Sequence, residues 1–152
     1  MPVTIIGADT KVGGAVVEAL LPRQGEVRVF VTDPDAAADI RSRGAKVALG
    51  DVSDGSHIGA AALSAFDAVL IAEAATDGRE RSFAADETAV FAEWAAALSE
   101  AGVQRAIWVS DDGIPDPIAT AVSEAASVNT AGRDPSAIAT EVAELDEAPT
   151  LG

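Results

Sequence analysis

The chain has 152 residues, the size of one ordinary domain. Its 10 basic and 25 acidic residues give a formal charge of -15, which disfavours nucleic acids and anionic membranes as partners. Without cysteine, disulfides and thiolate chemistry are excluded, and the single histidine, His57, excludes a histidine-rich metal site. We therefore expect no metal.

No apolar run reaches the 18 residues that a membrane span needs, and the chain opens on a strand pattern without a charged-then-apolar leader. We expect a cytoplasmic protein that forms a single domain over residues 1–152. Its core is expected at 3–113 and a helical C-terminal part at 114–147.

Short apolar runs alternate with alanine-rich amphipathic stretches in the first half of the chain. Asp33 is expected to cap the second helix, with Pro34 at its first position and Gly44 closing it, and Ser56 to cap the third. The predicted elements are strands at 3–6, 27–31 and 46–49, and helices at 12–21, 34–43 and 56–66.

The alternation continues in the second half of the chain up to residue 113 and becomes weaker beyond it. Strands are expected at 68–72 and 106–110. The long helix between them, at 82–101, should end at Gly102 and turn inward Phe83, Val90, Phe91, Trp94 and Leu98. Beyond 113, the stretches 116–128 and 135–145 look helical, and the chain stops where a sixth strand would begin.

Strand–helix alternation of this kind predicts an α/β fold, a doubly wound parallel sheet with helices on both faces. The expected sheet has about five strands in the order 3-2-1-4-5, joined by right-handed crossovers.

The stretch "IIGADTKVGG" (5–14) joins the first strand to the first helix through a glycine turn. In a phosphate-binding turn of this kind, glycines allow the tight turn, the approach of the phosphate and close packing of helix on strand. Here the pattern is Gly7-x-x-Thr10-x-x-Gly13, with Thr10 where the three-spaced pattern has glycine. A purely structural glycine turn is the alternative.

The side chains inside this turn leave its chemistry open. Thr10 either crowds a phosphate or donates its hydroxyl to it. Asp9 opposes an anion unless it points away, whereas Lys11 is the natural counter-charge.

Four blocks of the chain, in order and at matching spacing, resemble the NmrA-like atypical short-chain dehydrogenase/reductases. They are "IIGADTKVGGAVVEALL", "VRVFVTDPDAAADIRSRGAKVALGDVSD", "FDAVLIA" and "AGVQRAIWVSDDG", and together they cover roughly residues 3–113. The resemblance implies a Rossmann fold and NAD(P) binding. It also implies a cofactor site made of Gly7, Thr10, Lys11, Val12 and Gly13 at the phosphates, Asp51 and Val52 at the adenine, and Ala72 near the nicotinamide ribose.

The chain departs from this family after the second strand. Thr32 replaces the arginine that would pair with the 2′-phosphate of NADP, and Asp33 would favour a free ribose 2′-hydroxyl. NAD is therefore slightly preferred to NADP, unless Asp33 serves only as a helix cap.

The usual catalytic Tyr-x-x-x-Lys pair is absent, because the chain has no tyrosine and its lysines are Lys11 and Lys46. Ser110, at the end of the fifth strand, is a weak catalytic candidate, with a strand-end cap as the alternative. His57 is either a general base or, more plainly, an exposed histidine at a helix start. Asp111, Asp112 and Asp116 lack the ligand pattern of a divalent-ion site.

Three functions remain open from the sequence. The first is an NmrA-like NAD(P)-binding sensor or regulator without redox chemistry, the second an NAD(P)-dependent oxidoreductase, and the third an interaction module that has lost its cofactor. Phe83, Phe91 and Trp94 either form a homodimer seam or pack on the sheet.

Overall fold

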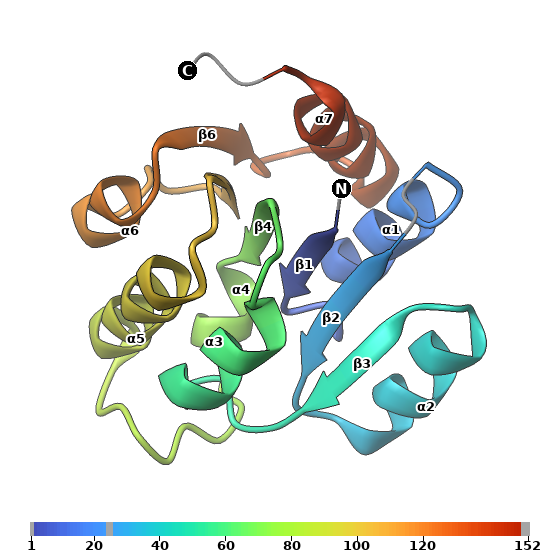
Figure 1. Cartoon of the computed structure of the whole chain (residues 1–152). Coiled ribbons are helices and arrows are strands. Elements are labelled where there is room, and N and C mark those ends of the chain that lie inside the picture. Colours follow the sequence, from blue (N-terminus) through green and yellow to red (C-terminus); the bar gives the residue numbers. More distant parts are fainter. Residues whose placement is uncertain (1, 24–25, 150–152) are drawn as a thin grey trace.

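The computed structural model of the chain describes residues 2–23 and 26–149. A parallel sheet forms the centre of the molecule (Figure 1). Within these residues the sheet has six strands in the order β3-β2-β1-β4-β5-β6. The strands are β1 (Val3–Ile6), β2 (Val27–Val31), β3 (Lys46–Leu49), β4 (Asp67–Ile71), β5 (Arg105–Ser110) and β6 (Glu124–Asn129). The Rossmann-like doubly wound fold is confirmed, with one strand more than the expected five.

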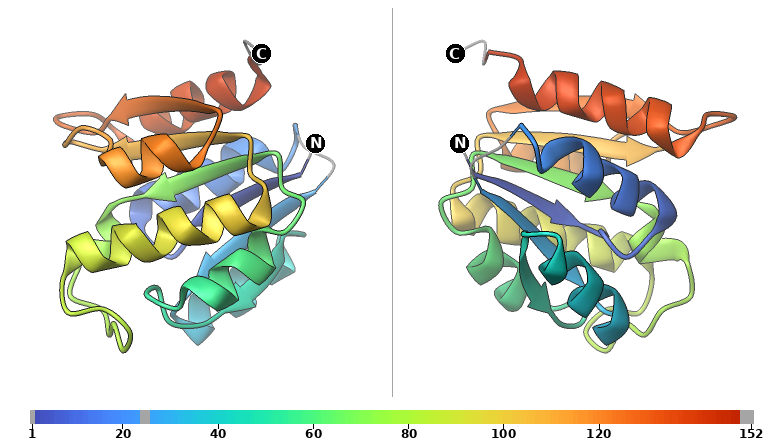
Figure 2. Two further views of the ribbon diagram at one scale, coloured as in Figure 1. Left: turned by 60° about the vertical axis from the view of Figure 1, so that its left-hand side comes forward. Right: turned by 90° about the vertical axis from the view of Figure 1, so that its right-hand side faces the viewer.

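Helices cover both faces of the sheet (Figures 1 and 2). One face carries α1 (Lys11–Leu20), α2 (Pro34–Ser42) and α7 (Pro135–Glu147). The other carries α3 (Gly55–Ala62), α5 (Glu87–Ala101) and α6 (Asp116–Ala121), and the one-turn helix α4 (Glu73–Thr76) follows β4.

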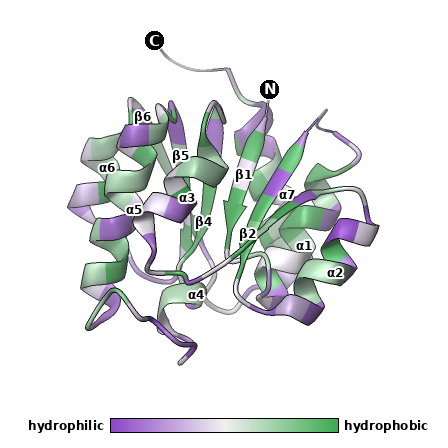
Figure 3. Ribbon diagram, turned by 60° about the horizontal axis from the view of Figure 1, so that its bottom comes forward, coloured by the Kyte–Doolittle hydropathy of each residue, from purple (hydrophilic) through white to green (hydrophobic). Residues whose placement is uncertain are grey.

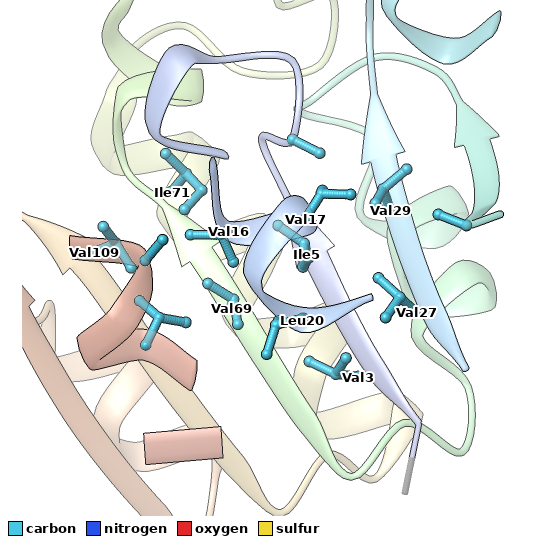
Figure 4. Close-up of a cluster of buried hydrophobic side chains, with 14 of the residues drawn as sticks. Val3, Ile5, Val16, Val17, Leu20, Val27, Val29, Val69, Ile71 and Val109 are labelled. Atoms are coloured by element: carbon cyan, nitrogen blue, oxygen red, sulfur yellow. The ribbon is translucent and has the colours of Figure 1, made fainter. Parts of the chain in front are cut away.

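The central strands are mostly apolar on both sides because both sides are covered. Every residue of β1 and β4 is buried, and Figure 4 shows Ile5 of β1 beside Val16 and Val17 of α1. The hydrophilic residues lie mainly on the outer faces of the helices and in the loops (Figure 3).

Most helix ends follow the local signals in the sequence. Asp33 caps α2 by accepting from the N–H of Asp35 at 3.0 Å, and Gly44, which follows the helix, has a left-handed φ of 107°. The expectation for Ser56 is wrong, because Asp54 caps α3 by accepting from the N–H of His57.

The predicted long helix at 82–101 starts five residues late. Asp86 caps α5 by accepting from the N–H of Ala89 at 2.9 Å, so residues 77–86 form a loop instead. Phe83 therefore does not face inward and is 63% exposed. Trp94 is buried, and the half-buried Phe91 meets it edge to face.

The helix predicted at 116–128 is also wrong over its second half. Only α6 is helical there, and residues 124–129 form β6, which pairs in parallel with β5 from Arg105 to Ser110. Tertiary pairing overrides the helical propensity of "SEAAS", because β6 closes the exposed edge of β5.

Arg105 anchors α7 at the amino edge of the sheet. Its guanidinium donates to both carboxylate oxygens of Asp67 at 2.9 Å and to the carbonyls of Asp146 and Ala148 at the end of α7. These hydrogen bonds with Asp67 raise the pKa of Arg105 above its ordinary value.

Candidate functional site

The β1–α1 turn is built around the side chain of Thr10. Its Oγ1 donates to the carbonyl of Gly7 at 2.8 Å and accepts from the N–H of Gly13 at 2.9 Å, which makes Thr10 the N-cap of α1. The hydroxyl is thus used within the turn, where it engages the Gly13 N–H at the start of α1.

Gly13 is the residue that allows α1 to pack directly on the turn. A Cβ atom at this position would lie 2.1 Å from the carbonyl oxygen of Gly7 and 2.7 Å from the Cα of Ala8. Only glycine fits, which is the close-packing role that the third glycine of such a turn plays.

Two amides at the start of α1 remain free to bind an anion. The first N–H groups of a helix have no partner inside it. Thr10 satisfies those of Gly13 and Gly14, whereas those of Lys11 and Val12 have no acceptor among the described residues. With the helix dipole and the exposed side chain of Lys11, these amides fit a diphosphate.

Asp9 turns away from this position and toward the end of β2. Its Oδ2 accepts from the N–H of Thr32 at 2.8 Å and from that of Asp33 at 3.2 Å, while its Oδ1 accepts from Arg79 at 2.7 Å. The Asp9 side chain is only 3% exposed. The carboxylate that the sequence placed against the phosphate is therefore held elsewhere.

A cavity of about 400 Å³ lies on the β2 side of the turn, and we call it the β2-side cavity. It is lined by Asp9, Thr32, Asp33, Asp77, Gly78 and Arg79. Burial alone would lower the pKa of Arg79, but hydrogen bonds and charge from Asp77 and Asp9 outweigh it and raise that pKa. Arg79 is therefore a fixed cation in this cavity.

A second cavity, of about 470 Å³, lies at the carboxyl ends of β4 and β5, and we call it the β5-side cavity. Val12 and Ala72 line it together with Phe91 and Trp108. Four carboxylate side chains also line it, and no lysine, arginine or histidine does so; the four are Glu73, Glu87, Asp111 and Asp112.

Ser110 also lines the β5-side cavity, and its Oγ accepts from the N–H of Asp112 at 3.0 Å. This is the strand-end interaction that was the alternative to a catalytic role. His57 lies on α3 with its ring edge-to-face on Phe30 at 5.1 Å, so it is half-buried rather than exposed. It lines neither cavity.

Asp51 and Val52 follow β3 and line neither cavity. The Val52 carbonyl accepts from the indole N–H of Trp94 at 2.8 Å, and the Asp51 carboxylate accepts from Ser53 and from the N–H of Ser82. Burial alone would raise the pKa of Asp51, but these hydrogen bonds outweigh it and lower that pKa. Both residues thus fasten the 77–86 loop and α5 to β3.

The structure brings together most of the site residues that the sequence proposed. The turn separates the two cavities, since Asp9 lines the β2-side cavity and Val12 the β5-side cavity. Asp33 lines the β2-side cavity and Ala72 the β5-side cavity. Arg79 was missed, because its contact with Asp9 joins residues 70 apart in the sequence and leaves no local pattern. Among the described residues no cluster of three metal-ligating side chains exists, and no helix is long and apolar enough to cross a membrane.

A glycine turn at a helix N-terminus between two cavities, at the carboxyl edge of a doubly wound sheet, defines the dinucleotide-binding class of Rossmann-like proteins. Residues 7–144 match the family described as NAD(P)H-binding, and the chain belongs to this family. No curated protein is significantly similar to the chain.

Solved structures with the same fold include several reductases. An anaerobillin reductase from Escherichia coli O157:H7 has a TM-score of 0.71 and 19% identity, over 99% of this chain and 93% of that one. A triphenylmethane reductase from Citrobacter sp. has a TM-score of 0.68 and 17% identity, over 86% of this chain.

Other similar structures contain a bound cofactor. The triphenylmethane reductase complexed with NADP(H) has a TM-score of 0.60 and 15% identity, over 95% of this chain and 46% of that one. An NADPH-dependent quinone oxidoreductase from Escherichia coli, complexed with NADPH, has a TM-score of 0.59 and 21% identity, over 78% of this chain and 41% of that one.

The chain spans 49% of the length of the triphenylmethane reductase, but nearly all of the anaerobillin reductase. At these identities the likeness establishes the fold.

Proposed function

We propose that the chain is a small NmrA-like reductase that uses a nicotinamide dinucleotide. The observation that carries this proposal is the β5-side cavity of about 470 Å³, which opens beside Val12 of the glycine turn. Its volume falls in the range of about 300–1,000 Å³ typical of ligand pockets. A reductase needs room for the nicotinamide and for an acceptor beside it, and this cavity at the carboxyl ends of β4 and β5 is where both would lie.

The proposed cofactor lies across the turn, with its diphosphate at the free amides of Lys11 and Val12. The adenosine extends toward the β2-side cavity and Asp33, with Asp51 and Val52 toward its adenine. The nicotinamide extends toward Ala72 and the β5-side cavity. Thr32, in place of an arginine, and the adjacent Asp33 favour NAD over NADP.

The charge of the β5-side cavity narrows the class of acceptor. Its four carboxylates, unopposed by any basic lining residue, repel anionic molecules and favour a neutral or cationic acceptor. The half-buried ring of Phe91 offers an apolar surface for an aromatic one, and the buried Trp108 supports that ring edge to face.

The absence of tyrosine favours reductions that need no proton from a protein side chain. A reduced nicotinamide supplies a hydride when bound. A cationic carbon acceptor becomes neutral on receiving that hydride and needs no proton, whereas a quinone takes its proton from water in this cavity. We propose that Ser110, which lines this cavity, orients such an acceptor, and that no acid or base on the protein is required.

The second candidate is a sensor that binds the same cofactor without turnover. The absence of tyrosine and the engagement of Ser110 with the Asp112 N–H favour it. The third candidate is an interaction module without cofactor, which the departures at Thr10, Asp9 and Thr32 favour. It ranks lower, because the amides of Lys11 and Val12 have no acceptor among the described residues and the Asp9 carboxylate is held at the end of β2.

Assembly and location are further parts of the proposal. We propose one domain over residues 1–152, in the cytoplasm. A homodimer would use the exposed ring of Phe83 rather than Phe91 and Trp94, which pack against each other and the sheet.

The test is NADH titration followed by acceptor assays with a cationic triphenylmethane dye, a neutral quinone and an anionic carbonyl compound. Binding with oxidation of NADH by the dye or quinone supports the reductase, and binding without oxidation supports the sensor. Lys11→Glu is the matched variant, because an acidic residue in the first turn favours the helix while opposing the diphosphate. Unchanged NADH affinity in Lys11→Glu would contradict the proposed position.

A further inference from the structure

The buried carboxylate of Asp9 lies at the end of β2 in an anion-binding site formed by hydrogen-bond donors. We call this group of donors the seat. Two consecutive backbone N–H groups, of Thr32 and Asp33, point at its Oδ2 from 2.8 and 3.2 Å. These amides lie at the N-terminal end of α2, where the helix dipole adds positive potential.

Arg79, which also lines the β2-side cavity, completes the seat. Its Nη1 donates to Oδ1 of Asp9 at 2.7 Å and to the hydroxyl of Thr32 at 3.3 Å. Its Nε and Nη2 donate to the carboxylate of Asp77 at 2.9 and 2.7 Å. The Arg79 side chain is 13% exposed, so this geometry is fixed by packing as well as by charge.

The position of the seat relates it to the cofactor. In a dinucleotide-binding fold the residues after the second strand contact the 2′ position of the adenosine ribose, and an arginine there binds a 2′-phosphate. Two amides and a guanidinium are the donors that a phosphate needs. Here the Asp9 carboxylate already holds these donors.

We propose that Asp9 is the specificity-determining residue for the cofactor, an internal anion that takes the place of the 2′-phosphate. It excludes NADP(H) by occupying the donors and by its charge, which with Asp33 and Asp77 outnumbers the single cation Arg79. A free 2′-hydroxyl is compatible with the filled seat. This inference rests on the proposed function. It attributes the discrimination between NAD(H) and NADP(H) to Asp9 and Arg79, and not to Thr32 and Asp33 alone.

The experiment compares 5′-AMP with adenosine 2′,5′-bisphosphate, and NADH with NADPH, by calorimetric titration of wild type, Asp9→Asn and Asp77→Asn. Wild type should prefer the compounds without the 2′-phosphate. Asp9→Asn should raise the relative affinity for the 2′-phosphorylated compounds by about tenfold or more, since the negative charge is removed and Arg79 loses its carboxylate partner at this position.

Asp77→Asn is the matched control, because it removes the same charge from the same cavity and from the same arginine. It leaves Asp9 in the seat, so the ratio should change by less than about threefold. Adding Arg79→Gln to Asp9→Asn should reverse the gain. If Asp9→Asn does not fold, Asp9→Ser keeps an acceptor for the Thr32 amide and allows the same comparison.

An unchanged ratio in Asp9→Asn, or equal shifts in Asp9→Asn and Asp77→Asn, would overturn the inference. If wild type binds neither NADH nor 5′-AMP, the proposed function fails. Adenosine 2′,5′-bisphosphate then decides the inference alone: its binding to Asp9→Asn but not to wild type supports the filled seat, and its failure to bind Asp9→Asn overturns it.

Discussion

Replacing Gly13 with alanine tests the turn, and Gly14 next to it provides a matched control. The alanine Cβ at 13 would lie 2.1 Å from the Gly7 carbonyl oxygen, far inside the 3.4 Å at which ordinary contact begins. Helix α1 would have to move outward by roughly 1 Å or more, pulling Val16 and Leu20 from the core. Overpacking of this kind costs about 1–3 kcal/mol, and we expect the upper end because the clash is with backbone.

The same substitution at Gly14 meets nothing nearer than the Ala8 carbonyl oxygen at 4.0 Å. Since alanine is the better helix former, Gly14→Ala should stabilise the protein by about 0.5–1 kcal/mol. Urea unfolding should therefore place the two variants about 3–4 kcal/mol apart in free energy of unfolding. Equal stability of Gly13→Ala and wild type would refute the packing that we describe.

Three further changes test other contacts. Thr10→Ala should lower the free energy of unfolding by about 1 kcal/mol through loss of the helix cap, and Thr10→Ser should restore most of it in the same urea assay. Asp67→Asn should cost about 3–5 kcal/mol, because it leaves the buried Arg105 without its charged partner; a thermal melt close to wild type would contradict this. Burial alone would raise the pKa of Asp77, but Arg79 outweighs it and lowers that pKa, so the ion pair stabilises the fold above the ordinary aspartate pKa of about 3.9. The stability gap between wild type and Asp77→Asn should accordingly shrink as the pH of the urea titrations falls below about 4.

The sequence predicts the central sheet well, because buried parallel strands such as β1 and β4 are mostly apolar, with Thr4 and Asp67 as the polar exceptions. It fails at β6, an edge strand in which alanine, serine and glutamate carry the helical propensity. Burial alternates along the whole of β6, but only Val128 is fully buried, so the period-two signal is too weak to outweigh that propensity. The start of α5 was visible in the sequence as Asp86 followed by Glu87, an N-cap signal that the apolar spacing from Phe83 obscured.

The candidate site was predictable where it depends on local geometry. Gly7, Thr10 and Gly13 lie together because they are neighbours in one turn. The orientation of Asp9 was not predictable, since its partners come from β2 and from the loop that carries Arg79. A buried carboxylate needs donors, but nothing in the sequence near Asp9 says which distant groups supply them.

The most direct test of the account is to follow backbone amide signals by NMR while NADH is added to the ¹⁵N-labelled protein. We predict saturable shifts of the Lys11 and Val12 amides, the two donors left free at the start of α1, together with signals from the β5-side cavity. NADH binding that leaves both amides unmoved, or no binding at millimolar NADH, would contradict a cofactor site at this turn.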